Sequence, residues 1–162
     1  MRIDDELYQL AVALGRAALA RSVRIATAES CTGGLVAGAI TAVAGSSDWF
    51  DCGFVTYSNE AKIGPLAVPP RTIEQFGAVS EETALSMAEG ALRASRAQWA
   101  VAVTGIAGPA GGTPDKPVGT VCFAWVGPGA AKTYRTCLDG DRAGIRRESV
   151  RIALQGVLDR LA

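Results

Sequence analysis

A serine and a cysteine stand side by side in the glycine-rich stretch Ala28-Glu29-Ser30-Cys31-Thr32-Gly33-Gly34. Apolar residues precede this stretch and small residues follow it, which predicts a tight turn from a strand into a helix. Backbone N–H groups at the start of a helix lack partners within the helix and can hold an anion or a tetrahedral oxyanion. Ser30 or Cys31 could therefore act as a nucleophile at this turn. In the plainer interpretation, Ser30 or Thr32 only caps the helix and the glycines allow close packing.

A nucleophilic serine needs a base, and the chain contains no histidine. This composition excludes the Ser-His-Asp and Cys-His catalytic sets and removes the commonest ligand of catalytic zinc. The base must then be a lysine, a tyrosine or a carboxylate, and the candidates Tyr57 and Lys62 lie at the end of a second predicted strand and just after it. A lysine activates a serine only as the neutral amine, so burial or a nearby positive charge must lower its pKa. Taken alone, such a lysine is more often a solvated helix residue, and such a tyrosine a half-buried strand aromatic.

Two later segments carry residues suited to binding. The stretch from Gly105 to Gly119 holds five glycines and three prolines, which let the backbone approach a ligand, although a flexible loop is the simpler interpretation. Arg142 could hold a phosphate with its guanidinium, or it could simply begin a helix that Asp141 caps. The other arginines of that helix are interpreted as its solvated face: Arg146, Arg147 and Arg151.

Alternating helices and strands are predicted to position these segments. Helices are expected over residues 4–21, 32–44, 59–63, 81–95 and 142–161, and strands over 23–28, 50–57, 99–104, 120–126 and 132–138. Pro69 and Pro70 are interpreted as a surface connection. Interleaved helices and strands predict one α/β domain over residues 1–162, a three-layer α/β/α sandwich with a mixed, mainly parallel sheet. Ligands of such sheets bind at the carboxyl ends of the strands, where the segments described above lie.

Composition limits the class of protein. The chain of 162 residues is 49% hydrophobic and carries 16 basic and 16 acidic residues, so it lacks the net positive charge that attracts nucleic acid or anionic membranes. The acidic start after Met1 is unlike a signal peptide, and no apolar run reaches the length of a membrane span. Four scattered cysteines suggest reduced thiols rather than a disulfide framework. A soluble cytoplasmic protein is therefore expected.

Seven short motifs, in order along nearly the whole chain, resemble those of the CinA C-terminal domain family. They are Ala28-Glu29-Ser30-Cys31-Thr32-Gly33-Gly34, Gly45-Ser46-Ser47, Tyr57-Ser58-Asn59-Glu60-Ala61-Lys62, Gly77-Ala78-Val79-Ser80, Thr104-Gly105-Ile106-Ala107-Gly108-Pro109, Lys116-Pro117-Val118-Gly119-Thr120 and Gly140-Asp141-Arg142. Members of that family are nicotinamide mononucleotide amidohydrolases, standing alone or fused to an N-terminal domain. The resemblance implies the stand-alone form for this chain.

The resemblance also implies residue roles. Ser30 matches the family's nucleophile and Lys62 its activating base, with Tyr57 beside them as a third catalytic candidate. Arg142 is expected to contact a phosphate, and residues 104–108 are expected to line the substrate pocket. The full set of expected substrate-binding residues is Thr32, Gly33, Gly34, Ser46, Asn59, Thr104, Gly105, Ala107, Gly108 and Arg142.

The implied reaction converts nicotinamide mononucleotide and water to nicotinate mononucleotide and ammonia through an acyl-enzyme, with no metal or other cofactor. Two alternatives stay open: a non-catalytic nucleotide-binding or regulatory module, and an amidase of the same mechanism that acts on another small amide. The expected partner is a small nucleotide substrate rather than nucleic acid or a membrane, and a homo-oligomer is compatible with the sequence.

Overall fold

The computed structural model describes residues 3–162; Met1 and Arg2, part of the acidic chain start that is unlike a signal peptide, lie outside the described residues. Helices and strands alternate along this range, as predicted. Their order and bounds are α1 (Asp5–Ala20), β1 (Ile25–Glu29), α2 (Leu35–Thr41), the 3-10 helix η1 (Ser46–Asp48), β2 (Phe50–Val55), α3 (Asn59–Ile63), α4 (Pro70–Phe76), α5 (Glu81–Arg93), β3 (Trp99–Gly105), β4 (Thr120–Gly127), β5 (Ala130–Cys137) and α6 (Arg142–Leu161).

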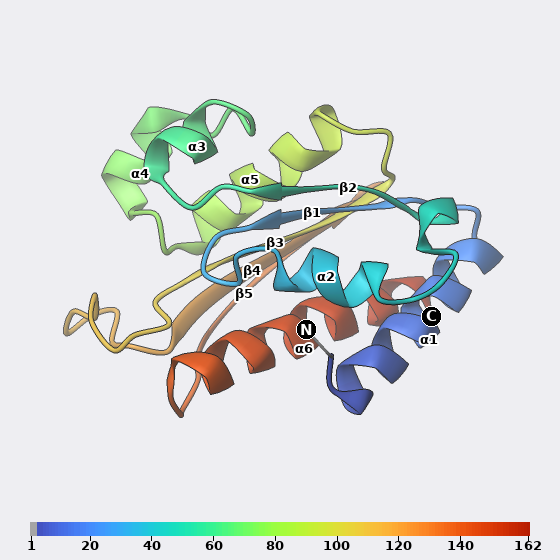
Figure 1. The fold of residues 1–162 in the computed structure, drawn as a ribbon. Helices are drawn as coiled ribbons and strands as arrows, with labels where there is room; N and C mark the ends of the chain where they lie inside the picture. Colours follow the sequence, from blue (N-terminus) through green and yellow to red (C-terminus); the bar gives the residue numbers. More distant parts are fainter. Residues whose placement is uncertain (1–2) are drawn as a thin grey trace.

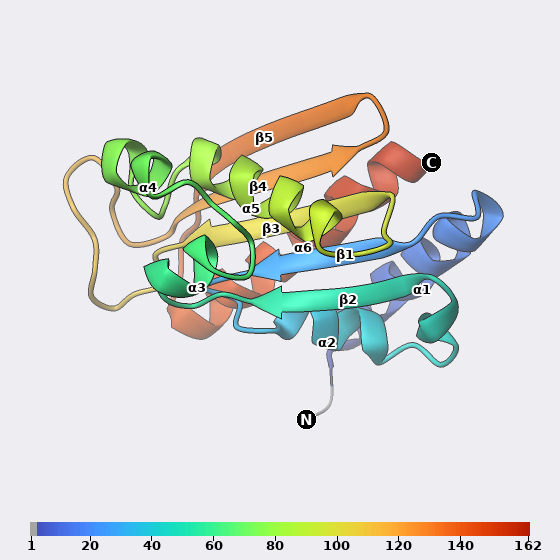
Figure 2. The same ribbon diagram turned by 90° about the horizontal axis from the view of Figure 1, so that it is seen from above.

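The strands of the described chain form one sheet in the order β2-β1-β3-β4-β5. Strand β1 pairs in parallel with β2 and β3, whereas β4 runs antiparallel to both β3 and β5. Within residues 3–162, β4 therefore opposes the other four strands, and the predicted mixed, mainly parallel sheet is confirmed. Strands β1, β2 and β3 all point toward one edge of the sheet, where α3 and the loop after β3 lie (Figure 2).

Helices cover both faces of this sheet (Figure 1). Helices α1, α2 and α6 lie on one face, and α3, α4 and α5 lie on the other. The predicted three-layer sandwich is thus confirmed. Because β1 lies between β2 and β3 and is covered by helices on both faces, all five of its residues are buried and show no alternation of buried and exposed positions.

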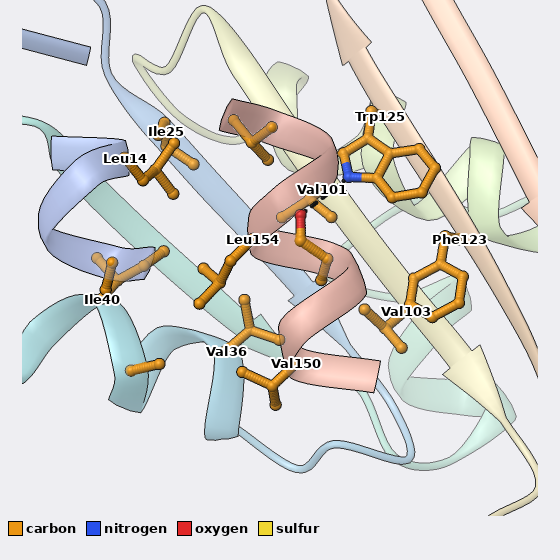
Figure 3. Packing of buried hydrophobic residues seen from close by; sticks show 14 of the residues in the cluster. Leu14, Ile25, Val36, Ile40, Val101, Val103, Phe123, Trp125, Val150 and Leu154 are labelled. Carbon is orange, nitrogen blue, oxygen red and sulfur yellow. Dashed lines mark hydrogen bonds between the residues drawn. The ribbon is translucent and has the colours of Figure 1, made fainter. Parts of the chain in front are cut away.

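The larger core lies between the sheet and helices α1, α2 and α6 (Figure 3). Trp125 donates from its indole Nε1 to the carbonyl oxygen of Ala153 at 3.0 Å, so a buried polar contact also fixes α6 on β4. A side chain at Gly156 would collide with the Trp125 ring, so this glycine lets α6 lie close to the sheet. The residues labelled in Figure 3 are Leu14, Ile25, Val36, Ile40, Val101, Val103, Phe123, Trp125, Val150 and Leu154.

The second core lies between the sheet and α5 and is rich in alanine. Alternate positions of three strands supply Ala26, Ala28, Ala100, Ala102 and Ala124 to it. Most of the α5 residues in this core are equally small (Ala84, Ala88 and Ala91), and Met87 is the larger exception. Small side chains on both surfaces allow the helix to lie close to the sheet, beside the strand ends where the candidate site is built.

Two predictions about helices are wrong. The helix expected over 32–44 is confined to α2, because Gly33 (φ +58°) and Gly34 (φ +97°) adopt left-handed backbone conformations that keep the chain in a turn until Leu35. The proline pair expected to form a surface connection instead begins α4, with Pro70 in its first turn, where the fixed φ of proline suits a helix. The bounds of the other predicted elements differ by no more than two residues. No helix within residues 3–162 has the length and hydropathy of a membrane span.

Candidate active site

The candidate site forms where the parallel strands β1, β2 and β3 end together. The amide of Ser30, just after β1, donates to the carbonyl oxygen of Val103 in β3 at 2.9 Å. The amide of Thr56, just after β2, donates to the carbonyl oxygen of Glu29 at 2.8 Å. These backbone contacts hold the segments after β1 and β2 next to each other. As expected for an α/β sheet, the candidate catalytic residues meet at the carboxyl-terminal ends of the strands.

Lys62 reaches back to this edge from the short helix α3. Ser58 begins that helix, because its side-chain Oγ accepts a hydrogen bond from the amide of Ala61 at 3.0 Å. The Lys62 side chain is only 1% exposed. Its Nζ lies 3.0 Å from Ser30 Oγ, 2.9 Å from the carbonyl oxygen of Thr56 and 3.5 Å from that of Ser58. The structure therefore brings together the two residues that the sequence singled out as nucleophile and base.

The surroundings of Lys62 favour the neutral amine. Burial lowers the pKa of the Lys62 amine from its usual 10.5, and the neighbouring Cys31 opposes this shift. No carboxylate of residues 3–162 forms an ion pair with Lys62. A neutral amine has two N–H groups and one lone pair. If the carbonyls of Thr56 and Ser58 accept the two N–H groups, the lone pair is left for the Ser30 hydroxyl proton.

The thiol of Cys31 is poorly suited to be the nucleophile. Burial raises the pKa of the Cys31 thiol to about 12. Since the thiolate is the reactive form, a thiol with its pKa raised in this way is almost entirely protonated and unreactive at pH 7. The space next to Cys31 Sγ is also small. A Cβ atom added at Gly105 would lie only 3.1 Å from Cys31 Sγ and 2.9 Å from Val121 Cγ2. Of the two neighbours, the geometry favours Ser30.

Glu29 occupies the helix terminus at which the sequence pattern predicts a site for an anion or an oxyanion. Its buried carboxylate accepts hydrogen bonds from the amides of Val36 at 2.8 Å and Ala37 at 3.0 Å, in the first turn of α2. The N-cap position itself is Gly34, without a side-chain cap. The expectation that these helix amides are free is therefore wrong, and neither Ser30 nor Thr32 caps the helix.

A hollow of about 230 Å³ opens beside the Ser30–Lys62 pair. Its lining includes the three predicted catalytic residues and half of the predicted substrate-binding residues, whose roles remain predictions. The lining residues are Ser30, Cys31, Tyr57, Asn59, Lys62, Ala78, Val79, Thr104, Gly105, Ala107 and Arg142.

The other predicted binding residues lie outside this lining. Gly33 and Gly34 form the turn before α2, and Thr32 is fully buried with no partner for its Oγ1 within residues 3–162. Gly108 contributes its carbonyl oxygen to the Arg142 guanidinium rather than a surface to the hollow. Ser46 begins η1, ahead of β2, so it lies at the opposite edge of the sheet from Ser30. The structure does not bring Ser46 to the hollow.

Arg142 and Tyr57 form the rim of the hollow. Arg142 donates from Nη1 to the carbonyl oxygen of Gly108 at 2.8 Å and from Nη2 to the hydroxyl of Tyr57 at 3.0 Å. Both acceptors are neutral, and Arg142 forms no ion pair with a carboxylate in the described chain. Tyr57 is 61% exposed and makes no hydrogen bond to Ser30 or Lys62. Because the Arg142 guanidinium has two neutral acceptors and no anionic partner in the described chain, it is available to bind an anion at the rim.

The structure corrects the interpretation of Arg146 as part of a solvated helix face. Arg147 and Arg151 do lie on a partly exposed face, where they pair with acidic side chains. Arg146, however, donates from Nε to the carbonyl oxygen of Cys31 at 3.0 Å and from Nη2 to that of Thr32 at 3.2 Å. This contact joins residues more than 110 positions apart, which no local pattern in the sequence could reveal.

Two apolar wall residues, Ala78 and Val79, were also not among the predicted site residues. The Oγ1 of Thr104 donates to the carbonyl oxygen of Ala78 at 2.8 Å and fixes this segment against β3. Apolar residues carry no chemical signal of their own, so the motif that contains them was the only indication. Within residues 3–162, no three His, Cys, Asp or Glu side chains cluster as a metal site would require.

Comparison with known proteins agrees with the motif pattern. The chain is 54% identical over 153 residues to the nicotinamide-nucleotide amidohydrolase PncC of Shigella flexneri, covering 94% of this chain and 93% of that protein. It is 49% identical to the protein of the same name from Pseudomonas putida, covering 95% and 96% of the two chains. The crystal structure of the competence/damage inducible protein CihA from Agrobacterium tumefaciens superposes with a TM-score of 0.95 at 46% identity, covering 99% and 98%. Residues 7–161 match the CinA C-terminal domain, and the chain therefore belongs to that family.

Proposed function

We propose that this chain is an amidohydrolase that converts nicotinamide mononucleotide and water to nicotinate mononucleotide and ammonia. The observation that carries the proposal is the 3.0 Å contact between Lys62 Nζ and Ser30 Oγ beside a hollow. Burying a lysine without a carboxylate partner lowers the stability of the fold. Its placement next to a serine is therefore better explained by a catalytic role than by a contribution to stability.

In the first half of the proposed reaction, Ser30 Oγ attacks the carboxamide carbon while Lys62 Nζ takes the hydroxyl proton. The carbonyl oxygen becomes an oxyanion. The amides of Cys31 and Thr32 donate to no carbonyl or carboxylate oxygen in the described chain and are available to bind it. Lys62 then gives the proton to the amide nitrogen, the C–N bond breaks, and ammonia leaves an ester on Ser30.

In the second half, water attacks the carbonyl carbon of the ester. Lys62, neutral again, takes a proton from the water as the new C–O bond forms. It returns that proton to Ser30 Oγ as the bond between Oγ and the acyl carbon breaks. The products are nicotinate mononucleotide and free enzyme, so each proton that Lys62 accepts is passed on within the same half-reaction.

The substrate is proposed to lie with its carboxamide in the hollow and its phosphate near Arg142. The hollow of about 230 Å³ meets a larger one of about 660 Å³, and Ala107 and Arg142 line both. The carboxamide and ring fit against the small walls beside Ser30, and the ribosyl phosphate extends past Arg142. The Arg142 guanidinium, whose protein acceptors are neutral, would gain an anionic partner. The pyridinium cation of the substrate adds a positive charge near Lys62 that further lowers its pKa.

The names of the relatives support the choice of substrate. Two proteins that are 54% and 49% identical to this chain are named nicotinamide-nucleotide amidohydrolases, and each match covers more than nine-tenths of both chains. At such identity and coverage, the reaction named for those proteins is the first to test on this one.

The test is ammonia release from nicotinamide mononucleotide by the purified chain, with the acid product identified by chromatography. We expect turnover by the unmodified chain and none by Ser30→Ala. Trapping the reaction with acid should give a chain heavier by the nicotinate mononucleotide acyl group, with Ser30 as the modified residue. Binding of the mononucleotide without ammonia release would instead indicate a non-catalytic binding module. Release from other small amides but not from this one would indicate a different amidase.

A further inference from the structure

Arg146 contacts the nucleophile turn, defined as residues 30–34, from outside the hollow. Its guanidinium donates to the carbonyl oxygens of Cys31 at 3.0 Å and Thr32 at 3.2 Å. It also covers Gly33, where a Cβ would lie 3.4 Å from Arg146 Nη2. One side chain of α6 thus spans three consecutive residues that follow the proposed nucleophile Ser30.

The neighbouring arginines show that this contact is not the default for α6. Arg147 pairs with Asp4 at 2.8 Å and with Glu6 at 2.6 Å, and Arg151 pairs with Glu148 at 2.6 Å. Arg146 forms no ion pair with a carboxylate within residues 3–162, and its Nε and Nη2 donate to backbone carbonyls instead. Its positive charge therefore acts on the peptide groups of the nucleophile turn.

The chemistry of a peptide group links these carbonyls to the proposed oxyanion site. The carbonyl of Cys31 and the amide of Thr32 are two ends of one planar unit. A guanidinium that binds the carbonyl end fixes the plane of the unit and polarises its N–H, which strengthens hydrogen bonds that the N–H donates. The Thr32 amide donates to no carbonyl or carboxylate oxygen in the described chain, so it is free to bind an oxyanion.

The rest of the turn is fixed by other contacts. Glu29 holds the first amides of α2, and the amide of Gly33 donates to the carbonyl oxygen of Ser30 at 3.0 Å. The carbonyl oxygens of Cys31 and Thr32 are acceptors, so they need N–H groups to donate hydrogen bonds to them. The amide of Leu35 gives one to Thr32 at 3.1 Å, and Arg146 supplies the donor to Cys31 and a second one to Thr32.

We propose that Arg146 is a positioning residue, which holds and polarises the nucleophile turn so that its amides stabilise the oxyanion formed when Ser30 attacks. This inference rests on the proposed amidohydrolase function. It places the effect of Arg146 on the chemical step, since the oxyanion exists only after the attack. Arg146 also lines the larger hollow of about 660 Å³, so a direct contact with the substrate phosphate is the rival role and would act on binding.

The experiment compares Arg146→Met with Arg147→Met on nicotinamide mononucleotide. Methionine keeps much of the arginine stem and removes the guanidinium. We expect Arg146→Met to lower kcat about 10- to 100-fold while KM changes less than about threefold. Calorimetry should give an unchanged Kd for nicotinate mononucleotide, the proposed product. Arg147→Met, which removes two surface ion pairs of the neighbouring residue on α6, should retain kcat within about twofold.

Arg146→Lys keeps a positive charge but replaces the planar guanidinium, which reaches the carbonyls of both Cys31 and Thr32, with a compact ammonium, so its kcat should lie between those of the unmodified chain and Arg146→Met. Thermal unfolding followed by circular dichroism identifies a variant that has lost its fold. If Arg146→Met does not fold, the kcat of Arg146→Lys is used as the test instead. A kcat within twofold of the unmodified chain would overturn the proposal, as would a loss confined to KM and to product binding. If the unmodified chain releases no ammonia, the proposed function itself fails. If the unmodified chain is active and the Arg146 variants are equally active, only the proposed role of Arg146 fails.

Discussion

Replacing Lys62 by arginine separates a proton acceptor from a mere positive charge. In the structure, Lys62 Nζ lies 3.0 Å from Ser30 Oγ, with two backbone carbonyls as its other partners. The neutral amine has a lone pair for the serine proton. Arginine stays protonated throughout the working pH range and has no such lone pair, although it keeps the charge and roughly the length.

The size of the loss follows from the role of a base. A positioned general base contributes about 100- to 10,000-fold, and a loss of 1,000-fold in kcat corresponds to about 4 kcal/mol of activation free energy. We expect Lys62→Arg and Lys62→Met to fall by at least about this factor in the ammonia-release assay. Because Lys62 is 1% exposed, the larger arginine also crowds its pocket, so circular dichroism must show that the fold is retained.

The activity of the unmodified chain should rise with pH, since burial lowers the pKa of Lys62 from 10.5 and the neutral form is the active one. The same shift affects stability. Between the lowered folded pKa and 10.5 the unfolded chain binds more protons than the folded chain. The free energy of unfolding should therefore rise with pH relative to Lys62→Met, by at most about 1.36 kcal/mol per pH unit. Urea unfolding of both proteins from neutral to alkaline pH measures this difference.

Two results would refute this reasoning about Lys62. If Lys62→Arg kept more than about a tenth of the activity, Lys62 would orient or stabilise charge instead of accepting a proton. The base would then have to be sought elsewhere, with Tyr57 first. If the stability difference between the unmodified chain and Lys62→Met did not change with pH, the lysine would hold its proton as in the unfolded chain.

Three further predictions concern the nucleophile, the phosphate and metals. Ser30→Ala should abolish ammonia release while Cys31→Ala keeps most of it, because burial raises the pKa of the Cys31 thiol to about 12; the reverse pattern would exchange the two roles. Arg142→Ala should weaken use of the mononucleotide much more than use of the riboside, measured as kcat/KM, and equal losses would make Arg142 structural. Incubation with a chelator such as EDTA followed by gel filtration should leave kcat unchanged, whereas a loss restored by a divalent cation would contradict the proposed mechanism.

The sequence was most informative where local rules apply. The strands and most helices follow from apolar periodicity and capping residues: Ser58 and Ser80 stand directly before the predicted helices 59–63 and 81–95, and they cap α3 and α5. The absence of histidine excludes a serine–histidine pair and makes lysine a candidate base, independently of any family resemblance. The shortened α2 was missed because the predicted helix included Gly33 and Gly34, whose left-handed conformations become apparent only in the structure.

Contacts between segments that are distant in the chain could not be predicted from the sequence. Nothing around Lys62 in the sequence shows that its side chain is buried, because burial depends on β1 and β2 being neighbours in the sheet. Glu29 and Arg146 were likewise missed as functional groups. Their partners are a helix terminus and two carbonyls, and these emerge only once α2 and α6 are packed. The expectation that charged residues on a helix face solvent holds for Arg147 but not for Arg146.

The surroundings of Lys62 can serve both protonation states that the proposed reaction requires. When the amine is neutral, the carbonyls of Thr56 and Ser58 accept its two N–H groups and Ser30 donates to its lone pair. When it is protonated, the same three oxygens accept its three N–H groups, so the transient cation has a complete set of acceptors. Burial without a carboxylate still disfavours that cation, and the proton is therefore passed on to ammonia or to Ser30 instead of being kept. A carboxylate partner would stabilise the protonated amine and remove the base, which gives a chemical reason for holding this lysine with backbone carbonyls alone.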